Sequence, residues 1–391
     1  MTTLKSSSKT NIREYTMGFA LVVLIIVLQF ATQGTMLKPL NVSNLLHQNM
    51  YVFVLGMGML LCILTGGNID LAVGSVVAFC GAIAGVLMVD MKVPTLPAVL
   101  LILLSGLAVG AWQGFWIAFV KVHPWITTLS GSLIFRGLAQ VILNGRSIGP
   151  FPEAYQFLAT GFLEDFSAGT GRHMLTLVIG AAGTLVLAAV LLISHYGNKK
   201  NGLPTESTGQ LIVKILIFAL FINAICWLLA GYKGISFAML VLVGLILIFS
   251  FITKKSVFGR HLYAMGGNIK AAKLSGINTK RMMFIVYLIS GLMAALAGIL
   301  VTSRLNAATP KAGVGYELDA VAACFLGGAS ISGGAGTVYG VMVGALIMGV
   351  LNNGMSLLGV SIDWQSAIKG LVVLVAVAFD MYFKNKQRYS I

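Results

Sequence analysis

Long apolar runs separated by short polar segments fill nearly the whole chain. About 20 apolar residues cross a bilayer as a helix, so the pattern predicts an all-α, polytopic bundle of about twelve spans. The runs at 50–66, 71–89 and 317–333 are short or interrupted by glycine, which indicates broken helices. Residues 1–391 are therefore expected to form a single transmembrane domain. The twelve runs fall at about 17–36, 50–66, 71–89, 97–120, 125–143, 173–194, 211–230, 235–253, 282–302, 317–333, 336–358 and 366–383.

Composition supports the same class. Hydrophobic residues make up 58% of the chain and charged residues only 9%, with a mean hydropathy of +0.94. Soluble domains carry roughly a quarter charged residues, so a water-soluble enzyme, a coiled coil and a disordered chain are excluded. The 46 glycines suit a protein whose membrane helices approach each other closely.

The net charge of +15 comes from basic residues between the apolar runs rather than from one basic cluster. Nucleic acid is therefore not an expected partner. More than half of the 26 Lys and Arg residues lie in segments on the same side as the N-terminus. The positive-inside bias then predicts that both termini are cytoplasmic. The first apolar run lacks a small-residue cleavage pattern and is interpreted as an uncleaved helix.

Two loops are long. The external loop 144–172 is either a solvated connector or a docking surface for an external partner. The internal loop 254–281 contains Asn268, a good N-cap, and Gly276, a good C-cap, for a two-turn helix at 269–275. A plain basic loop is the alternative, but a capped helix between glycines favours a protein-docking element.

Polar residues inside apolar runs are the candidates for a solute path. Asn68, Asp70 and Ser75 lie in the glycine-containing segment LTGGNIDLAVGS, which is either such a path or a plain turn between helices. Arg136 lies near the predicted bilayer centre and needs acceptors, either Asp70 or the carbonyls of Gly66 and Gly67. Its role is structural or substrate-binding.

The C-terminal third has further polar and small residues. Asn352 and Asn353 are expected to bind a neighbouring helix or a polar solute, while Gly336, Gly340 and Gly344 predict one closely packed helix face. Glu317 and Asp319 are expected at the outer interface rather than in the core. Lys214 and Lys369 lie near span ends and are expected to reach toward the interface.

Signatures of catalysis are missing from the sequence. It contains no GxxxxGK[ST] phosphate loop, and its five histidines lack metal-ligand spacing. We therefore expect no enzyme activity and no cofactor or metal in this chain. Two transporter classes stay open: a secondary carrier of six plus six helices, and a permease energised by a separate ATPase.

Several motifs resemble one family, the permease subunits of bacterial ABC monosaccharide importers. The motifs are GGNIDLAVGS, FRGLAQVILNG, FGRHLYAMGGNIKAAKLSGI, GYELDAVAACFLGGASISGGAGTVYG and LNNGMSLLGV. The material around 195–235 makes the chain most similar to the longer, xylose-type members, with ten spans plus an extra pair that we expect at the periphery. Ala72 stands where the family usually has serine.

The resemblance implies a monosaccharide importer, for a pentose or a hexose, in the inner membrane of a bacterium. It implies a second permease copy, a cytoplasmic ATPase that holds ATP and magnesium, an external sugar-binding protein, and surrounding lipid. The family's coupling helix maps onto seven positions of the internal loop: Gly267, Asn268, Ala271, Ala272, Leu274, Ser275 and Gly276.

Overall fold

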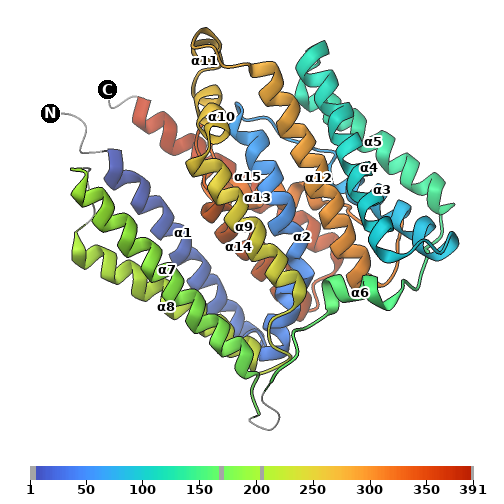
Figure 1. Ribbon diagram of the computed structural model, residues 1–391, viewed down its shortest axis with the longest axis horizontal. Helices are drawn as coiled ribbons and strands as arrows, with labels where there is room; N and C mark the ends of the chain where they lie inside the picture. Colours follow the sequence, from blue (N-terminus) through green and yellow to red (C-terminus); the bar gives the residue numbers. More distant parts are fainter. Residues whose placement is uncertain (1–5, 167–170, 203–206, 389–391) are drawn as a thin grey trace.

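A computed structural model describes residues 6–166, 171–202 and 207–388 (Figure 1). Every regular element in this part of the chain is a helix, as predicted. The helices are α1 (Ser6–Ala31), α2 (Pro39–Leu64), α3 (Val73–Gly85), η1 (Val86–Asp90), α4 (Thr95–Phe115), η2 (Trp116–Val120), α5 (Pro124–Leu143), α6 (Glu153–Thr160), α7 (Met174–Lys200), α8 (Thr208–Ala230), α9 (Phe237–Lys255), α10 (Val257–Gly267), α11 (Ile269–Leu274), α12 (Thr279–Leu305), α13 (Tyr316–Leu326), α14 (Val338–Leu357) and α15 (Ile362–Arg388).

Nine helices of the described residues are long and apolar enough to cross a membrane. The apolar part of α1, Met17–Ala31, is shorter, and α13 has only 11 residues. This agrees with the glycine-interrupted run expected at 317–333, because the helix ends at Leu326 and a loop follows. The total of twelve crossings stays a prediction.

Helices α2 and α12 form the centre of the bundle. The apolar window of α2 is 83% buried, and α12 packs against α4, α2 and α3. Helix α2 begins at Pro39, well before the predicted span at 50–66. The reason is that polar residues of its first turns, Asn41 and Asn49 among them, are buried and hydrogen-bonded, which an apolar pattern does not reveal.

Helices α7 and α8 form a hairpin at the edge of the molecule, beside α1 (Figure 1). Only 11% of the apolar window of each helix is buried. The hairpin's main packing is α7 against α8, and α8 also contacts α2. This position agrees with the peripheral location expected for the extra pair. Figure 1 also shows the start of α1, the end of α15 and α11 at one end of the molecule.

Two breaks in the helices bring glycine-rich loops together. One lies between α2 and α3, and the other between α13 and α14. Gly336 belongs to the second loop, where its φ of +146° lies outside helical geometry, so the predicted three-glycine helix face was wrong at this position. Gly340 and Gly344 do lie on α14 and pack against Gly327 and Ala323 of the preceding segment.

Candidate functional site

Arg136 on α5 anchors an irregular loop rather than pairing with an acid in the 65–72 turn. Its guanidinium donates to the carbonyl oxygens of Pro310 at 3.3 Å and Ala312 at 2.5 Å. These residues belong to the loop between α12 and α13. The suggested acceptors, Asp70 and the carbonyls of Gly66 and Gly67, were therefore wrong, because the sequence does not show that this later loop lies against α5.

The same loop packs tightly on α3. A side chain added to Gly74 would overlap the carbonyl oxygen of Gly313 and a carboxylate oxygen of Glu317. Glycine is thus needed where the irregular backbone meets the helix. Arg136 and this contact hold α3, α5 and the start of α13 in one arrangement.

Asp70 fastens the turn after α2 to α12. Its carboxylate accepts a hydrogen bond from the Ser290 hydroxyl at 2.6 Å and another from the backbone amide of Ala72 at 3.0 Å. The side chain is only 2% exposed. Asn68 is half-buried and donates to Thr65 at 3.0 Å, and Ser75 is buried on α3. The turn is thus rigidly positioned by short-range and long-range contacts.

Asn352 and Asn353 join α14 to α2. Asn353 and Asn41 exchange two hydrogen bonds, of 2.8 and 3.1 Å, and the Asn352 amide donates to Asn49 at 3.2 Å. The side-chain oxygen of Asn352 has no hydrogen-bond partner in the described residues. Of the two expected partners, a neighbouring helix and a solute, the structure shows the first.

A buried ionic cluster links α13 to α15 and α2. Asp319 is fully buried, and its carboxylate accepts hydrogen bonds from Tyr51 at 2.5 Å and from Lys369 at 3.0 Å. Tyr51 stacks on Tyr316, with ring centroids 3.6 Å apart. The expected interfacial position of Asp319 was therefore wrong, and Lys369 pairs with this buried carboxylate where it was expected to reach toward the interface. Sequence reasoning missed this cluster because nothing local shows which helices meet.

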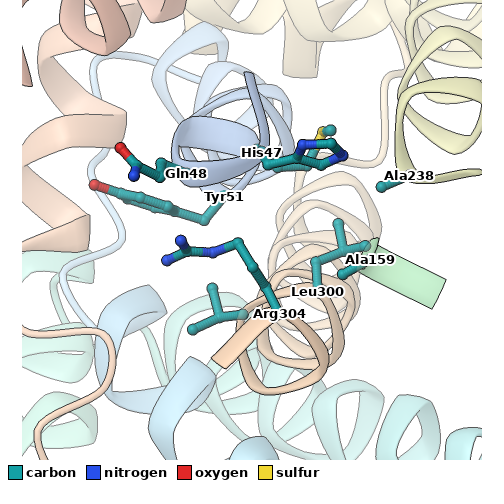
Figure 2. A pocket seen from close by; sticks show the side chains of 9 residues that line it. His47, Gln48, Tyr51, Ala159, Ala238, Leu300 and Arg304 are labelled. Atoms are coloured by element: carbon teal, nitrogen blue, oxygen red, sulfur yellow. The ribbon is translucent and has the colours of Figure 1, made fainter. Parts of the chain in front are cut away.

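A small hollow lies next to this cluster (Figure 2). It is lined by His47, Gln48 and Tyr51 of α2 and by Arg304 of α12, whose guanidinium extends toward Tyr51 and Gln48. The Nε2 atom of His47 has no hydrogen-bond partner among the described residues. The cavity volume is about 10 Å³, enough for about one water molecule. It is therefore too small to hold a sugar in this conformation.

Helix α11 confirms the capped helix predicted in the loop 254–281. The side chain of Asn268 accepts hydrogen bonds at 3.0 Å from the amides of Lys270 and Ala271. The helix ends at Leu274, one residue before the predicted end, and Gly276 follows with a φ of +83°. Ala272 is buried, whereas the Leu274 side chain is 90% exposed. Gly267, Ala271, Ser275 and Gly276 are also exposed.

Comparisons with known proteins give consistent matches. Residues 41–377 match the family described as the permease component of branched-chain amino acid transport systems. The chain is 37% identical to the xylose transport system permease protein XylH of Haemophilus influenzae, over 96% of this chain and 98% of the relative. It is 36% identical to XylH of Escherichia coli K12 over 96% of this chain and 93% of the relative. The ribose import permease protein RbsC of Escherichia coli K12 is 36% identical over 87% of this chain and 85% of the relative. No solved structure matches.

Proposed function

Because this chain belongs to the permease family that includes the xylose and ribose permeases, we propose that it is the membrane subunit of an ABC importer for a monosaccharide. The observation that carries the proposal is the match to xylose permeases along 96% of the chain. A pentose or a hexose is the proposed cargo.

The proposed assembly has two copies of this chain in the inner membrane of a bacterium, surrounded by lipid. A cytoplasmic ATPase, which holds ATP and magnesium, docks on α11, and both termini lie on the same side. An external sugar-binding protein docks at the opposite end, where the loop with α6 lies. Support comes from α11, which is capped, exposed and located at the same end as the start of α1 and the end of α15.

In the proposed mechanism, the binding protein releases sugar into a cavity between the two copies. ATP binding and hydrolysis in the partner move α11 and change which side of the membrane the cavity faces. We place Asn68, Ser75 and Arg136 along the path. Asp70, Asn352 and Asn353 support it by holding neighbouring helices in place, as their hydrogen bonds suggest.

The test is uptake of labelled xylose, ribose and galactose into proteoliposomes. The chain is reconstituted alone under proton and sodium gradients, and then with the ATPase and binding protein encoded beside it. We expect uptake only with both partners and ATP, and none with a non-hydrolysable ATP analogue. Uptake by the chain alone under an ion gradient would instead establish a secondary carrier.

A further inference from the structure

Three backbone segments meet directly at the end of the molecule that carries α11. They are the turn after α2, the loop between α13 and α14, and the C-terminal turn of α10. A Cβ atom added to Gly266 of α10 would overlap the carbonyl oxygen of Leu64 and the amide nitrogen of Gly334. That same amide of Gly334 donates to Leu64 at 3.2 Å. Gly266 therefore touches the last residue of α2, where the first loop begins, and the α13–α14 loop with its backbone alone.

The two loops also contact each other without intervening side chains. An added Cβ atom on Gly67 would overlap the carbonyl oxygen of Ile331, and one on Gly333 would overlap the Cα atom of Gly66. All of these glycines except Gly266 have a positive φ, which other residues rarely adopt. We call the set of Gly66, Gly67, Gly266, Gly333 and Gly334 the glycine junction.

The glycine junction is connected to α11 through α10, with almost no linker between the two helices. Asn268 is at once the C-cap of α10 and the N-cap of α11, so a single residue separates the two helices. Its amide donates to Ala264 at 3.1 Å, while its side chain caps α11. Tyr263 adds a second tie, because its hydroxyl donates to the carbonyl oxygen of Gly336 at 2.7 Å. A displacement of α11 is thus passed to α10.

We infer that Gly266 is a positioning residue that passes movement of α11 to both broken-helix loops through backbone contact. This inference rests on the proposed function, in which ATP binding and hydrolysis in the partner ATPase move α11. Backbone contacts suit the task because packed backbone has no rotamers to absorb a displacement. A methyl group at Gly266 would force the three segments apart while leaving the exposed surface of α11 unchanged.

The chain provides a matched control on the preceding helix, α9. An added Cβ atom on Gly244 meets nothing within 4 Å. Gly266→Ala and Gly244→Ala therefore add the same methyl group to a helix, and only the first disturbs the junction. Each variant is purified with the ATPase and reconstituted with the binding protein, and sugar uptake and ATP hydrolysis are measured on the same vesicles.

We expect the Gly266→Ala complex to assemble and hydrolyse ATP within about twofold of wild type, while sugar transported per ATP falls by about tenfold. The Gly244→Ala complex should match wild type in both. A purely structural role would lower assembly and hydrolysis together and leave the transport-to-ATP ratio unchanged. Equal ratios for the two variants would overturn the inference.

A measurement on the wild-type complex decides the matter if Gly266→Ala fails to accumulate. Amide hydrogen exchange is compared with and without ATP in α11, in the C-terminal turn of α10 and in the two broken-helix loops. Exchange that changes in all of these segments supports the inference, and a change confined to α11 overturns it. A wild-type complex without ATP-dependent uptake would instead overturn the proposed function, and the inference would fall with it.

Discussion

At the residue scale, the carboxylate of Asp319 is buried away from solvent. Its stability in the folded state therefore depends on the neighbouring side chains. Lys369 supplies the opposite charge at 3.0 Å, and Tyr51 supplies a hydrogen bond. The remaining carboxylate oxygen has no partner in the described residues. Breaking a buried pair leaves an uncompensated charge, and this costs more than removing both partners.

Lys369→Met should therefore lower the free energy of unfolding by about 3 kcal/mol. The double variant Asp319→Asn/Lys369→Met should recover much of this loss, because no buried charge then remains. The measurement is the thermal unfolding midpoint in detergent, with Lys200→Met, on the exposed end of α7, as the control. A double variant that is less stable than Lys369→Met would contradict the pairing energy.

At the scale of the element, α11 depends on the left-handed residue that follows it. The Gly276 amide donates to Lys273 at 3.1 Å, with φ at +83°. Proline lacks the amide hydrogen and requires a negative φ, so it cannot end the helix in this way. Gly359, after α14, has the same geometry: its amide donates to Ser356 at 3.1 Å, with φ at +71°.

Gly276→Pro should reduce copurification of the ATPase and sugar uptake by about tenfold or more, while insertion into the membrane stays normal. Gly359→Pro places the same backbone strain at the other end of the bundle and should retain ATPase binding. The comparison is made by pull-down of the partner from detergent. Normal uptake by Gly276→Pro would exclude α11 as the docking helix.

Local features of the elements could be predicted from the sequence, whereas their pairings could not. The caps of α11 and the breaks at Gly66 and Gly67 depend on residues a few positions apart, so a local pattern predicts them. Asn41 and Asn353 are 312 positions apart, and Asp319 and Lys369 are 50 apart. A single sequence does not show which helices are neighbours, so these pairs, and the acceptors of Arg136, could not be predicted.

At the scale of the whole molecule, the α7–α8 hairpin leaves the bundle and returns to it at nearly one point. The His173 amide donates to the carbonyl oxygen of Ala230 at 3.0 Å. Little of the hairpin is buried, although α8 contacts α2. At the base of the hairpin, the hydroxyl of Thr176 also accepts a hydrogen bond from the amide of Ile235 at 3.2 Å.

Replacing residues 174–229 with a short Gly-Ser linker should therefore leave a folded permease whose ATP-driven uptake is within about twofold of wild type. The lost Thr176 hydrogen bond should lower the free energy of unfolding by about 1 kcal/mol, and the lost contact between α8 and α2 should add to this decrease. Size-exclusion chromatography and the proteoliposome assay check both points. A well-folded variant without uptake would show that the hairpin takes part in transport.

The two ends of the α7–α8 hairpin lie together, and this has a consequence for how such a protein can evolve. A hairpin crosses the membrane an even number of times, so its gain or loss leaves every later segment on its original side. A single inserted helix would invert everything from α9 onward and move α11 to the opposite face. His173 and Ala230 are hydrogen-bonded neighbours at the base of the hairpin. A pair of helices can therefore be inserted or deleted between them during evolution, and the orientation of all other segments stays the same.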